Sequence, residues 1–418
     1  MKELKNIIIL NDFDYINGGA AQVAITSANA FAGLGFRVIF FSAVGNKGQT
    51  DLAETVTRYS TGQYDILRDP SRLRALRQGL WNSKAAHLLR SVLGELDPAE
   101  SVIHLHGWMK ALSPAIGKVL AHSGFPVVCT LHDYFAACPN GGFYNYRRKE
   151  ICTLQPLGIA CVCTNCDVRN YAQKGWRLVR QAVQWGLGKI PGGIRHFILI
   201  SKFSEAILRP YLPKSATIHL LSNPVTHSVS GRPRADVSRK KLLFVGRLSQ
   251  EKGAALACEA AARIGASLIV YGDGPLKAEL QAAYPGVEFR GWAPHAEIFG
   301  QMLESTALIF PSVCYETQGL VVPEALSVGL PVIVSDATAA RDFIDGGNGR
   351  LFRSGDSQDL AEKMNALLRD DTGTEISSRY AYKKYWDAPL SFDKFVSDSL
   401  SIYRQMQEES NTHNLSNT

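Results

Sequence analysis

Two carboxylates eight positions apart, Glu316 and Glu324, stand on either side of a predicted turn from a strand to a helix. Residues 307–312 are expected to form a buried parallel strand, because their apolar run shows no polar alternation and stops at Pro311. A carboxylate in the first turn of the following helix can accept two hydroxyl hydrogen bonds from a ribose or hexose diol. The alternative is that Glu324 merely favours the helix dipole, since acidic residues are common in first turns.

The start of that helix offers a second kind of chemistry, which is anion binding. A proline can stand in a helix only where its missing N–H would have been unpaired, so Pro323 predicts a helix that begins no earlier than about Val321. The amides near Gly319 and Leu320 are then left at the positive end of the helix dipole. Such an end is suited to a phosphate, and Glu316 would flank it from the preceding loop.

Two cations lie upstream in a similar setting, Arg247 and Lys252. Residues 241–245 are predicted to form a strand, and Gly246 and Gly253 let the backbone come close beside the two cations. A guanidinium offers a planar fork of donors and an ammonium a compact charge, a combination that suits the oxygens of a diphosphate. In the alternative interpretation both cations are solvated loop residues, which is less plausible for two anion-binding patterns in this order.

The order of these and further motifs resembles that of the family 4 retaining glycosyltransferases, which have the two-domain GT-B fold. The resemblance covers most of residues 5–405, and each motif alone would be weak evidence. The motifs are Asn17-Gly18-Gly19-Ala20-Ala21, His104-Leu105-His106-Gly107-Trp108, Thr130-Leu131-His132-Asp133, Ile200-Ser201-Lys202-Phe203, Ser222-Asn223-Pro224-Val225, Gly246-Arg247 with Glu251-Lys252-Gly253, Gly272-Asp273-Gly274-Pro275, and the pair Glu316 and Glu324.

The resemblance implies that the second domain holds most of a nucleoside-diphosphate sugar. The implied catalytic residues are His106, Arg247, Lys252 and Glu316, and the implied donor-binding residues are Gly18, Gly19, Gly246, Gly272, Gly274, Gln318, Gly319, Leu320 and Glu324. Glu316 is implied to hold hydroxyls of the sugar and Glu324 those of the ribose. Groups that bind the departing diphosphate better in the transition state than in the ground state would lower the barrier. The resemblance further implies retention of the anomeric configuration without a protein nucleophile.

Histidines are predicted at the carboxyl ends of two neighbouring strands of the first domain. By resemblance, His106 lies beside the donor sugar, and His132 and Asp133 line the acceptor side. A lone histidine would be better interpreted as a hydrogen-bonded residue at a strand end. Three histidines opposite the phosphate motifs, with His104 as the third, favour a role in the site.

The composition agrees with two α/β domains. At 418 residues, with 46% hydrophobic and 20% charged residues, the chain is globular and too long for one ordinary core. Apolar runs alternate with helical patterns in both halves, which predicts doubly wound, Rossmann-like sheets that bind ligands beyond the carboxyl ends of their strands. We expect an acceptor-binding domain at 1–205 and a donor-binding domain at 215–390, with the domain boundary near Pro210–Pro213 and Gly231–Pro233. A helix at 391–406 is expected to return to the first domain, and residues 407–418 are expected to form a disordered tail.

No catalytic metal ion or other catalytic cofactor is expected. Arg247, Lys252 and the helix dipole would neutralise the charge that a divalent ion would otherwise meet, and no Asp-x-Asp motif stands in a convincing setting at a strand end.

A structural zinc is a separate matter. Five of the eight cysteines crowd into residues 138–166, and Cys138, Cys152, Cys163 and Cys166 could supply four thiolates, with Cys161 able to replace either neighbour. The alternative is that all of these cysteines are free thiols.

The charge and hydropathy of the chain bear on its partners and location. No apolar run approaches the length of a membrane span, and no signal peptide is evident, so a cytoplasmic protein is expected. Two basic helical stretches with aromatic or leucine residues, 68–90 and 176–195, suggest peripheral docking on an anionic membrane surface. The alternative is that they are solvated faces of helices packed on the sheet. No motif for nucleic-acid binding appears.

Together these features predict an enzyme that moves a hexose from a nucleoside-diphosphate sugar to a glycan or lipid-linked acceptor. Bacterial surface polysaccharide, lipopolysaccharide or glycolipid synthesis is the setting that the family suggests, by analogy. Two other interpretations stay open. One is a nucleotide-sugar epimerase or phosphorylase on the same architecture, although no lysine for a pyridoxal cofactor can be identified. The other is a non-catalytic nucleotide-sugar-binding protein at the membrane.

Overall fold

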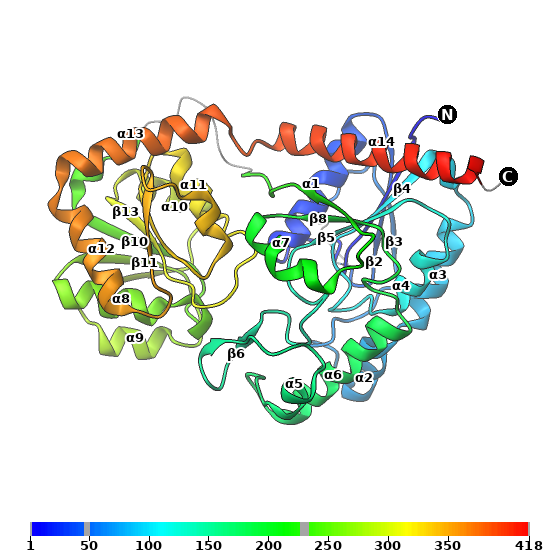
Figure 1. Cartoon of the computed structure of the whole chain (residues 1–418), viewed down its shortest axis with the longest axis horizontal. Coiled ribbons are helices and arrows are strands. Elements are labelled where there is room, and N and C mark those ends of the chain that lie inside the picture. The colour runs from blue at the N-terminus through cyan, green and yellow to red at the C-terminus, as the bar shows by residue number, and fades with distance from the viewer. Residues whose placement is uncertain (1, 46–50, 226–233, 417–418) are drawn as a thin grey trace.

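Two parallel sheets, one in each half of the chain, organise the computed structural model, and Figure 1 shows them side by side as separate domains. The structure describes residues 2–45, 51–225 and 234–416. Both sheets are built from short apolar strands connected by helices, as the alternating sequence pattern predicts. The predicted linker residues Gly231–Pro233 lie outside the described residues.

The first sheet has seven strands in the order β3-β2-β1-β4-β5-β8-β9, and all neighbours run parallel. Its strands are β1 (Asn6–Leu10), β2 (Arg37–Ser42), β3 (Thr57–Ser60), β4 (Ser101–Leu105), β5 (Val127–Leu131), β8 (His196–Leu199) and β9 (Thr217–Leu220). Its helices are α1 (Gly19–Gly33), α2 (Arg72–Leu80), α3 (Ser83–Leu93), α4 (Ala115–Ala121), α5 (Ile159–Cys163), α6 (Tyr171–Gly186) and α7 (Lys202–Leu208). A small antiparallel hairpin, β6 (Tyr144–Asn145) with β7 (Glu150–Ile151), lies between β5 and α6.

The second sheet has six parallel strands in the order β12-β11-β10-β13-β14-β15. Its strands are β10 (Lys241–Val245), β11 (Ser267–Tyr271), β12 (Glu288–Gly291), β13 (Ala307–Phe310), β14 (Val332–Ser335) and β15 (Gly349–Phe352). Its helices are α8 (Ala254–Ile264), α9 (Lys277–Ala283), α10 (His295–Leu303), α11 (Val321–Ser327), α12 (Ser357–Arg369) and α13 (Asp371–Asp387). The chain reverses its strand order between β10 and β13, and this switch point is where such sheets bind ligands.

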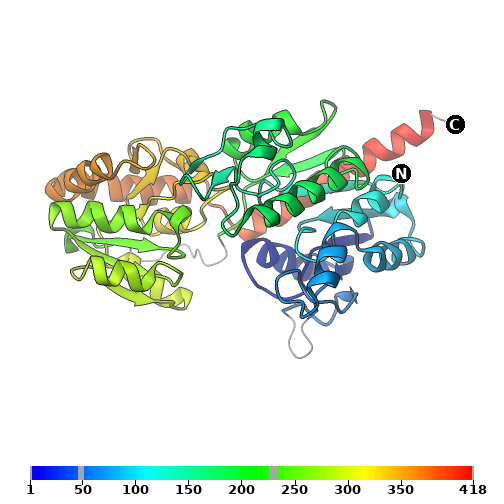
Figure 2. The ribbon, with the colours of Figure 1, turned by 90° about the horizontal axis from the view of Figure 1, so that it is seen from below.

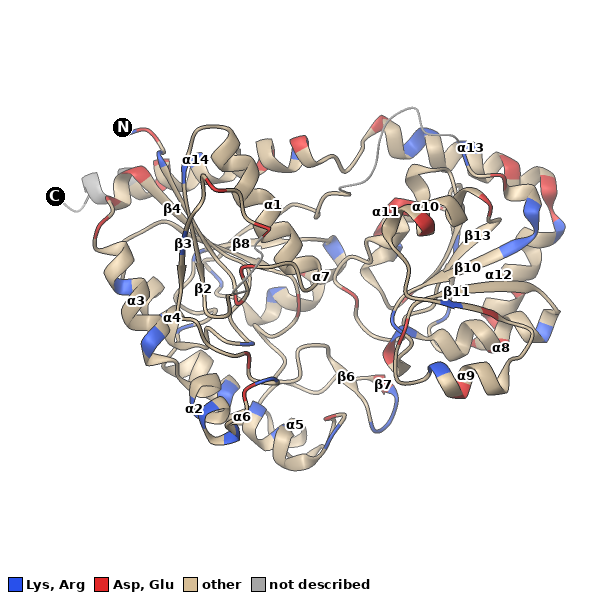
Figure 3. Ribbon diagram, turned by 180° about the vertical axis from the view of Figure 1, so that it is seen from behind, with Lys and Arg blue, Asp and Glu red and all other residues tan. Residues whose placement is uncertain are grey.

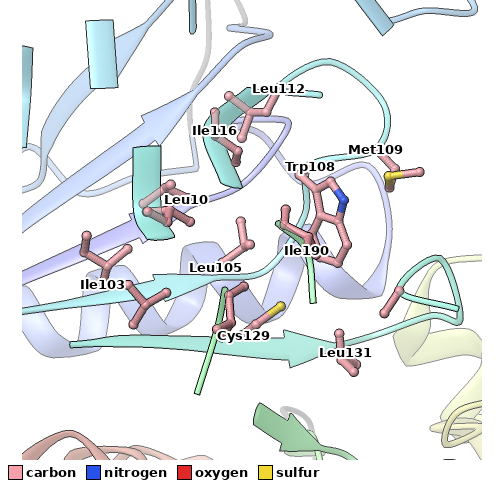
Figure 4. Close-up of a cluster of buried hydrophobic side chains, with 14 of the residues drawn as sticks. Leu10, Ile103, Leu105, Trp108, Met109, Leu112, Ile116, Cys129, Leu131 and Ile190 are labelled. Atoms are coloured by element: carbon pink, nitrogen blue, oxygen red, sulfur yellow. The ribbon is translucent and has the colours of Figure 1, made fainter. Parts of the chain in front are cut away.

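Apolar side chains cover both faces of each sheet. In the first domain one face is packed by α4 and the segment around Ile190, and Figure 4 shows Ile103 and Leu105 of β4 among the side chains of this cluster, with Ile116 of α4 and Trp108. The other face is packed by α1 and by the last helix of the chain, α14 (Phe392–Ser416). Burial on both faces explains why these strands read as unbroken apolar runs.

The boundary between the domains differs from the one predicted. β9 pairs with β8 throughout, so residues 217–220 belong to the first sheet, and the predicted domain limits of 205 and 215 are wrong. Ala235, near the start of the described part of the second domain, is buried in that domain's core, where its N–H donates to the oxygen of Val328. β9 escaped notice because it is an edge strand with half-exposed residues, and its apolar signal is weak.

The end of the chain returns to the first domain, as predicted for residues 391–406. Tyr403 and Met406 of α14 are buried against the first sheet, and α14 runs over that domain in Figures 1 and 2. The prediction of a disordered tail from residue 407 is wrong for 407–416, which continue the helix. Polar anchors hold this part: the amide of Gln407 donates to the oxygen of Ala99, and Glu409 pairs with Arg195 at 3.2 Å. Residues 417–418 lie outside the described residues.

Candidate active site

A cleft of about 390 Å³ lies between the two domains at the carboxyl ends of their strands. It brings together most of the residues that the sequence singled out. From the first domain it is lined by Gly19, Ala20, His132, Asp133, Ile200 and Asn223, and from the second by residues 244–247, Lys252, 310–312 and 316–321. The predicted meeting of Arg247, Lys252 and the start of α11 in one interdomain cleft is therefore found.

Lys252 is positioned by a tight turn that packs on the end of the neighbouring strand. Gly253 has φ 69°, and a Cβ atom there would lie 2.0 Å from the oxygen of Pro311, so only glycine fits. The oxygen of Glu251 accepts a hydrogen bond of 2.9 Å from the N–H of Val313. These contacts fasten the loop after β10 to the loop after β13, which places the Lys252 ammonium beside the carboxylate of Glu316.

Lys252 and Glu316 form an ion pair inside the cleft. The same Glu316 oxygen accepts a hydrogen bond of 2.9 Å from the Ser312 hydroxyl. Burial opposes the charge of Lys252, but the nearby Glu316 and other acidic groups outweigh it and raise the pKa of the ammonium. The lysine is thus cationic, and an anionic ligand that binds its ammonium group must share that group with Glu316. Ser312 was not predicted as a site residue, although its position directly after a buried strand places it at the edge of the sheet where ligands bind.

Helix α11 begins at Val321, where Pro323 placed it, and its first turn faces the cleft. Gly319 has φ 76°, and a Cβ atom there would lie 2.7 Å from the ring of Phe310. The first amide to bond back into this turn is that of Val322, which donates to the oxygen of Gly319 at 2.9 Å. Leu320 and Val321 precede it and line the cleft, so the predicted anion-binding end of the helix is open to a ligand.

The loop between Glu316 and Gly319 also joins the two domains. The Thr317 hydroxyl donates to the oxygen of His132 at 2.9 Å, and the oxygen of Thr317 accepts from the Ser201 hydroxyl at 2.8 Å. The Gln318 amide makes two bonds of 3.0 Å with the backbone of Asn223. Gln318, which was predicted to bind the donor, lines the cleft, and its side-chain amide is occupied by these two contacts between the domains.

Three neutral histidines lie in contact with one another on the first-domain side of the cleft. The rings of His104 and His106 lie 3.9 Å apart, and His106 Nδ1 lies 3.0 Å from His132 Nε2. Burial is the largest cause that lowers the pKa of His104 to about 3, of His132 to about 4 and of His106 well below its usual value. Among the described residues, the Nε2 atom of His106 is buried without a hydrogen-bond partner. His132 lines the cleft, whereas His106 supports it from behind.

Two aspartates of the first domain flank this group. Asp133 lines the cleft with an exposed side chain, and desolvation by the surrounding cleft walls raises its pKa to about 6. Asp12, which the sequence did not suggest, is buried and accepts backbone bonds from Lys110, Ala111 and Leu112 at 2.8–2.9 Å. Asp12 therefore fixes the loop after β4, whereas Asp133 faces the cleft.

The predicted donor-binding glycines separate into two groups. Gly19 and Gly246 line the cleft, and Gly18, whose oxygen accepts from Gln22 at 3.0 Å, precedes α1 next to it. Gly272 and Gly274 do not line it: a Cβ atom at Gly272 would lie 1.9 Å from the oxygen of Gly246, and one at Gly274 would lie 2.3 Å from that of Leu248. These last two glycines let the loop after β11 pack under the Arg247 loop.

Glu324 lies one turn inside α11 and does not line the cleft itself. Its carboxylate lies 3.2 Å from Nε2 of His295, at the start of α10. His295 was not anticipated, because nothing in its sequence surroundings links it to residue 324.

The four cysteines predicted to hold zinc differ in their exposure. Cys163 is exposed, whereas Cys138 and Cys166 are buried and Cys152 is half-buried. In the part of the chain that the structure describes, no group of three or more His, Cys, Asp or Glu side chains is arranged to hold a metal ion. The sulfur of Cys166 accepts a hydrogen bond of 3.1 Å from the ammonium group of Lys174.

Comparison with known proteins gives two family matches that together cover most of the chain. Residues 17–229 match the model for Glycosyltransferase Family 4, and residues 239–370 match the model for Glycosyl transferases group 1. The division between the matches falls at the boundary between the two domains of the structure. The second match contains Arg247, Lys252, Glu316 and Glu324.

Sequence relatives match only in part. The chain is 33% identical over 147 residues to the sulfoquinovosyl transferase SQD2 of Arabidopsis thaliana, covering 34% of the chain and 29% of that protein. It is 29% identical over 187 residues to a phosphatidyl-myo-inositol mannosyltransferase of Mycobacterium leprae, covering 40% and 49% respectively. The matches thus span less than half the length of these relatives.

Solved structures share the whole architecture at low identity. A sucrose-phosphate synthase from Thermosynechococcus elongatus superposes with a TM-score of 0.70 at 19% identity, over 96% of this chain and 99% of that one. The Anabaena protein HepE, in complex with UDP and glucose, superposes with a TM-score of 0.64 at 17% identity, over 96% and 100%. These likenesses confirm the predicted two-domain GT-B fold.

Proposed function

This chain belongs to the family 4 glycosyltransferases, and from that premise we propose that it moves a hexose from a nucleoside-diphosphate sugar to a glycan or lipid-linked acceptor. One observation carries the proposal: Arg247, Lys252 and the start of α11 converge in a single cleft between the domains. Two cations and a helix start suit a ligand with two adjacent negative charges.

The diphosphate is proposed to lie between Arg247, Lys252 and the amides of Leu320 and Val321. As the glycosidic bond lengthens, negative charge grows on the leaving group, and preorganised donors that meet it there lower the barrier. In the free protein Lys252 is held by Glu316. Binding of the donor would let Glu316 turn one oxygen to sugar hydroxyls while the lysine meets the phosphate. The pairing with Glu316 keeps the ammonium in place before the donor arrives.

The two carboxylates are proposed to hold different parts of the donor, Glu316 the sugar and Glu324 the ribose. Glu324 lies deeper in α11, and its contact with His295 at 3.2 Å fixes the direction of one oxygen. The other oxygen is then free to accept hydrogen bonds from a diol. The base would lie near the loops that contain Gly272 and Gly291, which are tied together by a hydrogen bond of 2.7 Å.

The acceptor side is proposed to be formed by His132 and Asp133, with His106 behind them. Neutral histidines can donate and accept hydrogen bonds without repelling the electron-poor anomeric carbon that forms as the leaving group departs. Stacking on His104 and bonding to His132 hold the His106 ring in place. We propose that the anomeric configuration is retained and that the departing phosphate oxygen takes the acceptor's proton on the same face of the sugar. We also propose catalysis without a metal ion, because two side-chain cations meet the phosphate charge.

A cytoplasmic location with peripheral contact to an anionic membrane is also proposed. Over the described residues, no helix has the length and apolar character of a membrane span. The face of α2 is the better candidate for contact, because Leu73 is 68% exposed there among arginines, visible as blue segments in Figure 3. The second basic stretch is weaker than predicted, since Arg180 is buried and Arg177 pairs with Asp167 at 3.1 Å. The lipid substrate in the name of the mannosyltransferase relative supports a lipid-linked acceptor.

A donor screen followed by a transfer assay tests the proposal. Thermal shift of the purified chain against UDP-, GDP- and ADP-sugars should single out one donor, and that donor should lose its sugar to an acceptor in extracts of bacterial glycolipids or surface polysaccharides. Donor that is isomerised or hydrolysed equally well without acceptor would point to an epimerase-like enzyme. Binding without any turnover would point to a non-catalytic binding protein.

A further inference from the structure

One aromatic side chain of the second domain lies among rings of the first domain. Tyr315 directly precedes Glu316 in the loop after β13. The centre of its ring lies 5.4 Å from that of Phe203, 6.1 Å from that of Tyr134 and 6.2 Å from that of Phe143. Although Tyr315 belongs to the second domain, it packs against the hydrophobic core of the first. We call the three first-domain rings the aromatic socket.

The aromatic socket is a fixed part of the first domain. Tyr134 and Phe143 are 1% and 4% exposed and belong to the core of that domain. Phe203 lies in the first turn of α7, which stands at the border between the domains in Figure 1. Its N–H donates to the carboxylate of Asp342 in the second domain at 2.9 Å. Because tilted and edge-to-face rings at these distances attract one another, the socket holds the Tyr315 ring against the first domain.

The rest of this loop is held by the first domain as well. The Tyr134 hydroxyl donates to the main-chain oxygen of Glu316 at 3.5 Å, and the N–H of Ala339 in the second domain donates to the same oxygen at 3.1 Å. The next two residues make the hydrogen bonds to the first domain that were described for the cleft. Each residue from 315 to 318 therefore contacts the first domain, and the place of Glu316 depends on these contacts.

The phosphate-binding side of the cleft is held differently. The turn at Gly253, which places Lys252, packs on Pro311. The oxygen of Glu251 accepts the bond from Val313 that joins the same two loops. All of these contacts lie within the second domain. A movement of the first domain away from the second would therefore disturb the loop that carries the sugar-binding carboxylate more than the turn that carries the lysine.

We propose that Tyr315 is a positioning residue for the donor sugar. Its ring, docked in the aromatic socket, fixes the main chain of Glu316, so that the carboxylate reaches the sugar hydroxyls only while the two domains are closed on each other. The inference rests on the proposed function, in which Glu316 holds the sugar and Lys252 the diphosphate. Since coupling between two binding events is reciprocal, a donor that carries its sugar strengthens the docking of the domains more than the diphosphate alone does.

The contribution of the sugar to the binding affinity is the quantity that tests this role. Calorimetry compares UDP-glucose, GDP-mannose and ADP-glucose with UDP, GDP and ADP, and the pair that the native chain binds gives a ratio of donor affinity to diphosphate affinity. Phe203→Ala removes the nearest ring of the socket and leaves the main-chain bond to Asp342 in place. Phe203 is not one of the described residues that line the cleft. We expect this variant to lower the ratio about tenfold, as for the loss of one hydrogen bond to a charged group, and to change diphosphate affinity less than about twofold.

Further variants separate positioning from simple packing. Tyr315→Phe keeps the ring and should give the native ratio, whereas Tyr315→Ala should lower the ratio as Phe203→Ala does. Phe125→Ala is the matched control and should leave the ratio unchanged, since Phe125 is a half-buried residue that packs on the first-domain core before β5, at the end of the sheet away from the cleft. An equal fall of the ratio in this control, or equal losses of donor and diphosphate affinity in Phe203→Ala, would overturn the inference.

Hydrogen–deuterium exchange without any ligand tests the docking of the loop independently of the proposed function. Phe203→Ala should speed exchange at the amides of residues 315–318, and Phe125→Ala should not. Unchanged exchange there in Phe203→Ala would overturn the inference even for a chain that transfers sugar. A native chain that binds none of the three diphosphates would overturn the proposed function instead, and the role of Tyr315 in sugar binding would fall with it.

Discussion

Replacing Lys252 with methionine should weaken the binding of nucleoside diphosphates by about tenfold. A hydrogen bond to a charged group contributes about 1.5–3 kcal/mol, which corresponds to a factor of about 10 to 150 in affinity. The structure argues for the lower end, because Lys252 is already paired with Glu316 in the free protein and exchanges one anion for another on binding. Methionine is unbranched and keeps most of the length and volume of the lysine side chain, so the turn at Gly253 should be preserved.

The measurement is isothermal titration calorimetry with the diphosphate that the donor screen identifies and with the matching monophosphate. Lys363→Met is the matched control, since Lys363 makes a surface pair with Asp359 on α12 at 3.4 Å and lies away from the cleft. We expect the diphosphate to lose about tenfold in affinity, the monophosphate less, and the control neither. Affinity within about twofold of the native value in Lys252→Met would refute the assignment of the lysine to the phosphate.

Glu316→Gln should release Lys252 and tighten diphosphate binding a few-fold while it removes most sugar transfer, and a variant that binds diphosphate more weakly by calorimetry would contradict this. The pKa of Asp133 is raised to about 6, so Asp133→Asn should abolish a step near pH 6 in the pH dependence of the transfer rate. If the step is unchanged in the variant, it belongs to another group. Gln318→Ala should lower the free energy of unfolding by about 2 kcal/mol, as two interdomain hydrogen bonds are lost, which denaturant titration measures. The pKa of His132 falls from 6.5 to about 4 on folding, so its contribution to stability is present above pH 6.5 and lost as the pH falls towards 4. His132→Gln should therefore flatten the pH dependence of the unfolding midpoint between pH 6.5 and 4. An equally steep curve for the variant would argue against the burial effect.

The parts of the site that the sequence predicted are those with a local physical cause. Pro323 limits where α11 can begin, and the helix starts at Val321. Gly253 and Gly319 have positive φ and no room for a Cβ atom, so a glycine at each position is itself a local signal of a tight turn. Such constraints act within a few residues and can be read without knowing the rest of the fold.

The parts that the sequence did not predict depend on contacts between distant segments. Gln318 looked like a ligand-binding residue, but its amide is taken by the backbone of Asn223 from the other domain. The contact between Glu324 and His295 joins two helices whose packing no spacing rule specifies.

The prediction for the end of the chain failed for the same reason. The polar residues after Met406 suggested disorder, yet Gln407 and Glu409 bond to the first domain. Polarity in a sequence does not reveal whether a partner lies across the fold.

Hydrogen–deuterium exchange of the native chain, with and without the nucleoside-diphosphate sugar that stabilises it most, tests the central claim most directly. If the diphosphate is held by Arg247, Lys252 and the start of α11, the donor should slow exchange together in residues 246–253 and 316–322, on the two sides of one cleft. Protection confined to only one of these segments, or placed outside the cleft altogether, would contradict the account.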